Sequence, residues 1–261
     1  MSTIHATYEI DGPLAVLTFN RPEARNAMTL GMYEALVNAC DRVDEESDVR
    51  VLILRGAGGK AFVAGTDISL FQDFGRPEDG INYERRIDEV LDRLERVTKP
   101  TIAQVQGVAA GGGCAIALTC DLCVATPEST FGIPIARTLG NCLSGATLGR
   151  LIDQMGPAAV KDMLFTGRFL DAGEAHGLGF LTRIEPADTI DAAVREYGRR
   201  IASHAPLTLR AIKEMIRRVL AQRRLREGDD QDLITMCYTS ADFREGVMSF
   251  LDKRTPKWTG T

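Results

Sequence analysis

The stretch that decides the fold is V-Q-G-V-A-A-G-G-G-C, residues 105–114. Its three consecutive glycines lie between an apolar run typical of a strand and a small-residue run, 114–120, typical of a helix. Glycine loses more backbone entropy on folding than other residues, so such a cluster indicates unusual dihedral angles or a close backbone approach. At a helix start, unpaired N–H groups and the helix dipole favour negative charge. The stretch therefore predicts a strand–turn–helix unit that can hold developing negative charge.

A second turn of similar character lies upstream, in K-A-F-V-A-G-T-D, residues 60–67, after a predicted strand at 51–55. Taken alone, either turn could simply be a tight connection. Together, the two turns can each direct one backbone N–H at the same oxygen. Such a pair of preorganised donors is what an oxyanion hole requires.

Six segments of the chain, in this order, resemble the crotonase superfamily, the enoyl-CoA hydratase/isomerase group. They are residues 19–27, 61–68, 106–114, 121–125, 165–178 and 245–254. The resemblance implies an α/β fold, a crotonase-type spiral of ββα turns with a C-terminal helical oligomerisation region. It places an acyl-CoA-binding core at residues 1–204 and a helical trimerisation region at residues 205–261. The implied assembly is a homo-trimer or a hexamer.

The resemblance also implies a binding site. The backbone N–H groups of Thr66 and Gly112 would form the oxyanion hole for the thioester. Coenzyme A would enter as part of the acyl-CoA substrate, and no tightly bound cofactor is expected. The residues expected to contact coenzyme A, the last two from a neighbouring subunit, are Ala24, Arg25, Ala64, Asp67, Ile68, Phe250 and Lys253. The helical spacing of Phe250 equally allows plain core packing.

Two glutamates that hydratases of this family use are absent from this chain. The first would follow the glycine triplet, where Ala115 stands, and the second would end the motif F-G-I-P-I, where Ile135 stands. Hydration moves two protons, and general acid–base catalysis contributes typically ~10²–10⁴-fold. We therefore expect this chain to be a poor ordinary hydratase.

The segment after the second lost glutamate offers other chemistry. Arg137 could pair with a substrate carboxylate, and Asn141 could orient water or a carbonyl group. Cys142 could act as a nucleophile or an acid if its pKa were lowered, or it could fill a pocket wall as buried thiols often do. An acid within residues 72–84 is a further source of protons, and the candidates are Asp73, Glu78 and Glu84.

Several functions on an acyl-CoA thioester stay open at this point. An enzyme would work through an enolate that the oxyanion hole stabilises. Decarboxylation needs no base, because loss of CO₂ itself generates the enolate, whereas isomerisation needs one base. A catalytically silent acyl-CoA binder is the alternative of a different class.

Composition limits the partners and the compartment. The chain has 261 residues and a net charge of −5, which argues against nucleic acid as a partner. The uncharged run 101–120 holds four glycines and two glutamines, so it predicts strand–turn–helix and no membrane span. Residues 1–12 lack the apolar core of a signal peptide, so a cytoplasmic protein with reduced cysteines is expected. Cys120 and Cys123 have no second pair nearby, so no metal site is predicted.

Local patterns complete the prediction. Residues 56–61, G-A-G-G-K-A, match a dinucleotide-binding fingerprint, but no helix pattern follows at once, so we reject that function. Residues 72–83 are polar and predict a mobile loop, followed by a charged helix at 83–97. Three helices are predicted near the C-terminus, at 207–226, 230–239 and 241–252.

Overall fold

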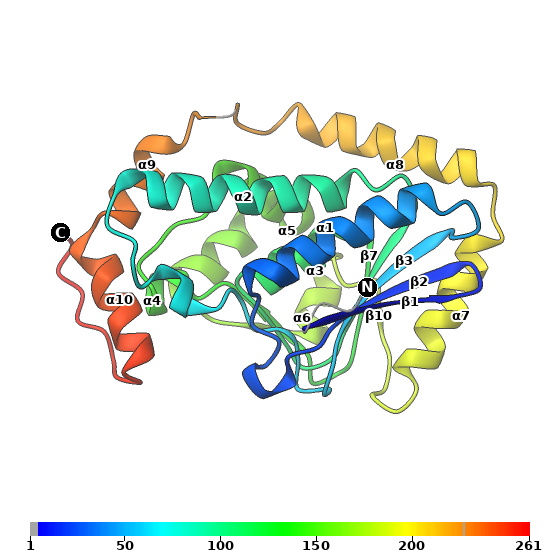
Figure 1. The fold of residues 1–261 in the computed structure, drawn as a ribbon, viewed down its shortest axis with the longest axis horizontal. Coiled ribbons are helices and arrows are strands. Elements are labelled where there is room, and N and C mark those ends of the chain that lie inside the picture. The colour runs from blue at the N-terminus through cyan, green and yellow to red at the C-terminus, as the bar shows by residue number, and fades with distance from the viewer. Residues whose placement is uncertain (1–4, 227) are drawn as a thin grey trace.

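The computed structural model describes residues 5–226 and 228–261, which form two β-sheets with helices packed around them (Figure 1). The larger sheet has six strands, in the spatial order β1 (Ala6–Asp11), β2 (Leu14–Phe19), β3 (Val51–Gly56), β5 (Thr101–Val105), β7 (Leu122–Ala125) and β10 (Arg183–Ile184). The smaller sheet has four strands, in the order β4 (Ala61–Val63), β6 (Val108–Ala110), β8 (Thr130–Gly132) and β9 (Leu170–Asp171).

The helices follow the strands in a repeating order. They are α1 (Leu30–Glu45), α2 (Pro77–Glu95), α3 (Gly112–Thr119), α4 (Ile135–Thr138), α5 (Gly145–Thr166), α6 (Ala172–Gly177), α7 (Ile190–Ala202), α8 (Pro206–Ala221), α9 (Gln231–Tyr238) and α10 (Ala241–Leu251), with the 3₁₀ turns η1 (Pro22–Ala24) and η2 (Ile68–Phe71). Strands β3 and β4 precede α2, β5 and β6 precede α3, and β7 and β8 precede α4 and α5. The predicted spiral of ββα turns is confirmed.

The central strands of the larger sheet are covered on both faces. Strands β1 and β2 form an antiparallel hairpin, whereas the remaining neighbours in this sheet are parallel. Every residue of β2 is buried. Alternate side chains of β2 and β3 pack toward α1 and α2 on one face and toward α7 on the other. Parallel strands between two helical layers read as continuous apolar runs, which is why 51–55 reads as a buried strand.

The helix ends show why one loop prediction is wrong. Thr29 caps α1, and its side chain accepts a hydrogen bond from Met32 N–H. The segment predicted as a loop, 72–83, is already helical from Pro77, so the helix expected at 83–97 begins six residues early. Proline at a first helical turn costs no hydrogen bond, and the Asp79 carboxylate accepts from the N–H groups of Gly75 and Arg76. These local caps outweigh the polar composition of the segment.

Two expectations about the rest of the chain can be checked directly. The turn after β3 leads into strand β4 and not into a helix, so rejecting the dinucleotide fingerprint was correct. Among the described residues, no helix combines the length and apolar character that crossing a bilayer requires.

The C-terminal helices have two different environments. Helix α8 lies along one edge of the molecule (Figure 1) and has no buried residue, and several of its apolar side chains are more than half exposed, namely Leu207, Met215, Ile216 and Val219. Helices α9 and α10 instead share a core cluster with η2 and the α4–α5 loop, made of Phe71, Leu139, Ile234, Tyr238, Phe243 and Val247. The exposed α8 face suits an assembly, which stays a prediction together with the boundary at residues 204 and 205.

We predict that Gly246→Ala detaches α10 from the α4–α5 loop. A Cβ at Gly246 would overlap the carbonyl oxygen of Leu139, so the helix must move away from that backbone. Overpacking of this kind typically costs about 1–3 kcal/mol of stability. The measurement is the free energy of unfolding in urea.

Gly177→Ala serves as the matched control, because no atom lies within 4 Å of a Cβ added at Gly177. We expect that variant to unfold like the wild type. A Gly246→Ala protein of unchanged stability would contradict this account of how α10 is held.

Candidate active site

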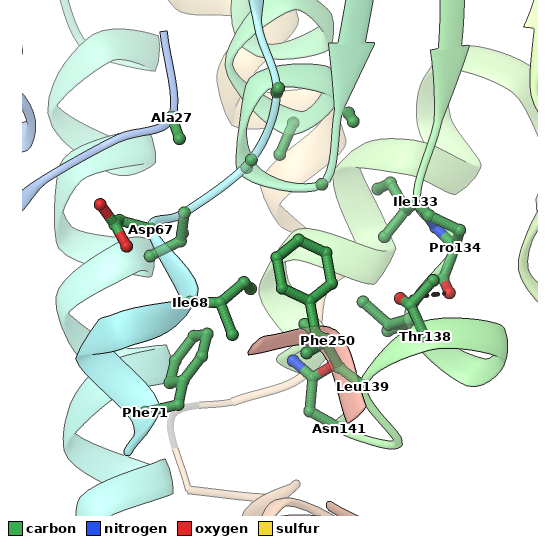
Figure 2. A pocket seen from close by; sticks show the side chains of 18 of the residues that line it. Ala27, Asp67, Ile68, Phe71, Ile133, Pro134, Thr138, Leu139, Asn141 and Phe250 are labelled. Carbon is green, nitrogen blue, oxygen red and sulfur yellow. Dashed lines mark hydrogen bonds between the residues drawn. The ribbon is translucent and has the colours of Figure 1, made fainter. Parts of the chain in front are cut away.

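A cavity of about 660 Å³ lies where the two glycine-bearing turns, α2, α4 and α10 meet. Figure 2 shows Ile68 and Phe71 on one side of this cavity, Ile133, Pro134 and Thr138 on the other, and Phe250 between them. Most of the labelled side chains are apolar. The cavity is therefore suited to a ligand with an apolar body and a small number of polar anchoring points.

The Thr66 and Gly112 backbones supply two such anchoring points. Residue Thr66 forms an isolated parallel bridge with Met28, in which Met28 N–H donates to Gly65 O at 2.8 Å and Asp67 N–H donates to Met28 O at 2.9 Å. In this pattern the N–H of Thr66 itself points away from Met28. Gly112 is the first residue of α3, so its N–H has no acceptor within the helix. Both residues line the cavity, as an oxyanion hole requires.

Glycine is required where the two turns meet. Strand β4 pairs with β6, so the chain after Val63 and the chain after Ala110 leave the smaller sheet side by side. A Cβ at Gly113 would overlap the Val63 carbonyl, and Gly65 and Gly111 adopt φ angles of 101° and 51°, which favour glycine. The glycine triplet thus brings the start of α3 against the upstream turn.

Three hydroxyl groups adjoin this pair of N–H groups, and no sequence pattern predicts that they meet. The Thr66 hydroxyl lies 2.7 Å from the Tyr33 hydroxyl and 2.7 Å from the Tyr83 hydroxyl. Burial raises the pKa of Tyr33 to about 12 and raises the pKa of Tyr83 well above its usual value. All three groups are therefore neutral hydroxyls near pH 7. The residues come from α1, the turn after β4 and α2, so no local spacing indicates that they meet.

The two positions at which hydratases carry glutamate also line the cavity. Ala115 lies in the first turn of α3 and is buried, and Ile135 begins α4. Both side chains are apolar, so neither can transfer a proton. The structure thus places the two substitutions read from the sequence beside the pair of free N–H groups.

The loop residues predicted to supply other chemistry separate into two groups. Arg137 and Asn141 line the cavity, and the Asn141 side-chain amide donates to the Tyr238 hydroxyl at 3.1 Å. Cys142 is not among the lining residues, because its thiol points to the Leu233 carbonyl oxygen, 3.8 Å away. A hydrogen bond with Cys237 and burial raise the pKa of the Cys142 thiol, so it stays protonated.

Of the three acids considered in residues 72–84, Glu84 lines the cavity, and Asp73 and Glu78 do not. Glu84 belongs to helix α2, where it is buried and accepts hydrogen bonds from the Tyr238 hydroxyl at 2.5 Å and from Ser144 N–H at 3.0 Å. Burial raises the pKa of Glu84 to about 8 despite these two bonds. The side chain is thus a neutral carboxylic acid at physiological pH.

Most of the residues expected to contact coenzyme A line the same cavity, namely Ala24, Arg25, Ala64, Asp67, Ile68 and Phe250. Lys253 does not line it and is exposed after α10. The resemblance implied that Phe250 reaches in from a neighbouring subunit, but here Phe250 lines the cavity of its own chain. Asp67 is occupied, because its carboxylate pairs with Arg21 at 2.6 Å. Burial alone would raise the pKa of Asp67, but hydrogen bonds from Ser69 and Arg21 outweigh it and lower that pKa.

Among the described residues, no cluster of histidine, cysteine, aspartate or glutamate side chains could hold a metal ion. The Cys120 and Cys123 side chains are buried thiols that belong to the core around α3 and β7.

Comparison with known proteins places this geometry in a family. The family model described as enoyl-CoA hydratase/isomerase matches residues 9–261. The chain belongs to the enoyl-CoA hydratase/isomerase family. A short-chain-enoyl-CoA hydratase of Clostridium acetobutylicum is 32% identical over 248 residues, which cover 94% of each chain.

Two solved structures of the enoyl-CoA hydratase/isomerase fold illustrate the range of relatives. An enoyl-CoA hydratase/carnithine racemase from Magnetospirillum magneticum has a TM-score of 0.81 at 31% identity, covering 100% of this chain and 97% of that one. A methylmalonyl-CoA decarboxylase in complex with 2S-carboxypropyl-CoA has a TM-score of 0.90 at 28% identity, covering 100% of both chains. Family membership therefore establishes the fold and an acyl-CoA enzyme, and it leaves the reaction to be argued from the residues.

We predict that Glu84→Gln flattens the pH dependence of stability. Glu84 stays protonated in the folded protein up to about pH 8, whereas in the unfolded chain it ionises near its ordinary value of 4.5. Its contribution is complete below about pH 4.5 and is lost as the pH rises toward 8. Linkage puts the loss between pH 5 and pH 8 at roughly 3 kcal/mol. Urea unfolding at several pH values measures it.

Glu78→Gln is the matched control, since Glu78 lies exposed on the same helix. That variant should keep the wild-type slope, whereas Glu84→Gln should lose most of it. Equal slopes for wild type and Glu84→Gln would show that Glu84 is ionised in the folded protein.

Proposed function

We propose that this protein decarboxylates a malonyl-type acyl-CoA, a thioester that carries a carboxylate on its α-carbon. The observation that carries the proposal is the pairing of two free N–H groups, from Thr66 and Gly112, with apolar side chains at both hydratase glutamate positions. Decarboxylation is the reaction on a thioester for which that combination suffices, because it needs charge stabilisation and no base.

The chemistry follows from where the charge moves. When the bond between the α-carbon and the carboxylate breaks, its electron pair enters the thioester and negative charge develops on the carbonyl oxygen. The two N–H groups stabilise that oxygen. Meanwhile the carboxylate becomes neutral CO₂, which needs no polar partner. Ala115 and Ile135 give the cavity wall the apolar character that disfavours the carboxylate and tolerates CO₂.

The charges around the cavity agree with an anionic substrate. Arg25 and Arg137 line the cavity, and among the described residues neither is paired with a carboxylate. Asp67 is neutralised by Arg21, and Glu84 is protonated. A second carboxylate on the acyl group therefore meets no unpaired negative charge. We assign Arg25 to the phosphates of coenzyme A and Arg137 to the entering carboxylate.

The comparisons support decarboxylation in one respect and hydration in another. The methylmalonyl-CoA decarboxylase has a higher TM-score than the hydratase/carnithine racemase, 0.90 against 0.81, although its identity to this chain is lower. The relative from Clostridium acetobutylicum is named a hydratase. We give more weight to the missing glutamates than to that name, because a hydratase needs both proton transfers.

The proposal extends to the surroundings of the site. Coenzyme A would be contacted by the six cavity residues listed above for it, from Ala24 to Phe250. Lys253 would reach its phosphates only from another subunit. The exposed apolar face of α8 would be covered in a homo-trimer or a hexamer, and the protein would work in the cytoplasm.

The purified wild-type protein should release CO₂ from malonyl-CoA or methylmalonyl-CoA and hydrate crotonyl-CoA poorly. In the double variant Ala115→Glu/Ile135→Glu, the two restored carboxylates should raise hydration of crotonyl-CoA by at least ~10²-fold. They should also lower CO₂ release, because they repel the substrate carboxylate. Spectroscopic loss of the enoyl thioester and trapped CO₂ measure the two activities.

The matched control is Ala115→Gln/Ile135→Gln, which adds the same bulk without an ionisable group and should not hydrate. A wild-type protein that hydrates crotonyl-CoA as fast as the double glutamate variant would refute the proposal. Tight binding of both thioesters without conversion of either would indicate a silent acyl-CoA binder.

A further inference from the structure

The three hydroxyls beside the oxyanion hole have more donors than they use. Tyr33, Thr66 and Tyr83 carry one O–H each, and two hydrogen bonds join them, both 2.7 Å long. The one further interaction of these hydroxyls among the described residues is a weaker one between Tyr33 and Tyr83. The two short bonds use two of the three O–H groups, so the third can turn from this weaker partner to a bound ligand. If Tyr33 donates to Thr66 and Thr66 donates to Tyr83, the remaining O–H belongs to Tyr83, which lines the acyl cavity.

The hydroxyl chain lies directly against the oxyanion hole. Thr66 supplies one of the two free N–H groups. Its hydroxyl therefore belongs to the same residue whose N–H would donate to the thioester oxygen. A Cβ added at Gly112, which supplies the other N–H, would lie 2.7 Å from the Tyr33 hydroxyl and 3.6 Å from the Thr66 hydroxyl. A thioester held by both N–H groups would place its α-carbon two bonds from the bound oxygen, close to these hydroxyls.

Tyr33, the residue at the far end of the hydroxyl chain, also borders another cavity. This space of about 590 Å³ lies between α1 and α2, and Figure 1 shows these two helices running next to each other. Its other polar lining residues are Glu34, Asn38, Asp41, Arg86, Glu89 and Arg93. Two ion pairs cross it, Glu34 with Arg86 at 2.8 Å and Asp41 with Arg93 at 2.6 Å. The side chain of Tyr33, only 1% exposed, thus separates the hydroxyl chain from a second, charged cavity.

We infer that Tyr83, Thr66 and Tyr33 form a proton relay that protonates the α-carbon of the enolate. The inference rests on the proposed decarboxylation. In the step, the new C–H bond takes the proton of Tyr83, and the O–H electron pair stays on the Tyr83 oxygen. That oxygen takes the proton of Thr66, Thr66 takes the proton of Tyr33, and Tyr33 takes one from a water molecule of the second cavity, which becomes hydroxide. In sum, one carboxylate and one water become CO₂, a C–H bond and hydroxide.

The relay accounts for how a proton reaches the cavity while the substrate is bound. Decarboxylation consumes one proton per turnover, and a bound acyl-CoA fills the mouth through which water would enter. The acid on the cavity wall, Glu84, has both oxygens engaged, one with Tyr238 and the other with Ser144. Burial keeps Tyr33 and Tyr83 protonated near neutral pH, so both can donate. Tyr83 is then the catalytic residue, and Thr66 and Tyr33 act through it.

The test separates carbon–carbon bond cleavage from protonation. Methylmalonyl-CoA is decarboxylated in D₂O, CO₂ is trapped, and the configuration of the deuterium at the α-carbon of the product is determined. The wild type should give a single configuration, because Tyr83 delivers deuterium to one face. Tyr83→Phe should still release CO₂, but deuterium should enter from both faces. Thr66→Val should do the same, and Thr66→Ser, which keeps the hydroxyl, should restore the single configuration.

The fraction of D₂O in the solvent provides a second measurement. A relay moves several protons in one step. The rate of product formation by the wild type should therefore vary nonlinearly with the fraction of D₂O in the solvent. Tyr33→Phe removes one of the transferred protons, so it should reduce the curvature of this dependence. Tyr33→Phe keeps the aromatic ring that α1 contributes at this position, so this variant can be used if Tyr83→Phe fails to fold.

Tyr8→Phe is the matched control, because the Tyr8 hydroxyl donates to Glu46 and takes no part in the chain. It should behave as the wild type in both measurements. A single configuration from Tyr83→Phe and Thr66→Val, with wild-type rates, would overturn the relay and leave decarboxylation standing. A wild type that releases no CO₂ would overturn the proposed function, and the relay with it.

Discussion

The approach of the Gly113 backbone to the Val63 carbonyl is the contact on which the candidate site depends. No side chain fits between them, so α3 begins directly against the turn that follows β4. The pairing of β4 with β6 fixes the direction in which the two turns leave the smaller sheet. Because both polar groups that result are main-chain N–H groups, their placement depends on the path of the chain and on glycine. Substitution of nearby side chains leaves them intact.

That independence explains how one fold can carry different reactions. The oxyanion hole binds the charge that every enolate shares, whereas the side chains around it decide how protons move. By the family resemblance, Ala115 and Ile135 stand where a hydratase carries its two glutamates, and Thr66 places a hydroxyl at the hole itself. Fold and thioester binding therefore follow from family membership, and the reaction follows from a few side chains.

The sequence predicted the site to the extent that backbone and local spacing determine it. The glycine triplet, the upstream turn and the two missing glutamates can each be read from a short continuous stretch of sequence, and all of them line the cavity or shape it. The Tyr33–Thr66–Tyr83 cluster and the contact of Glu84 with Tyr238 were out of reach, because each joins residues from elements far apart in the sequence. The loop predicted at 72–83 failed for the opposite reason. There a strong local cap, Pro77 with Asp79, outweighs a composition typical of loops.

The burial of Glu84 links the C-terminal helices to the chemistry of the cavity. Its carboxyl group is covered by Tyr238 of α9, and the aromatic rings of Phe71, Phe74 and Phe243 complete that cluster. Removing water in this way raises the pKa of Glu84 and keeps the cavity wall uncharged. An ionised carboxylate at this position would repel a malonyl-type substrate and would weaken the charge that the N–H pair must stabilise. The neutrality of the acyl cavity therefore depends on the packing of helix α9 against α2.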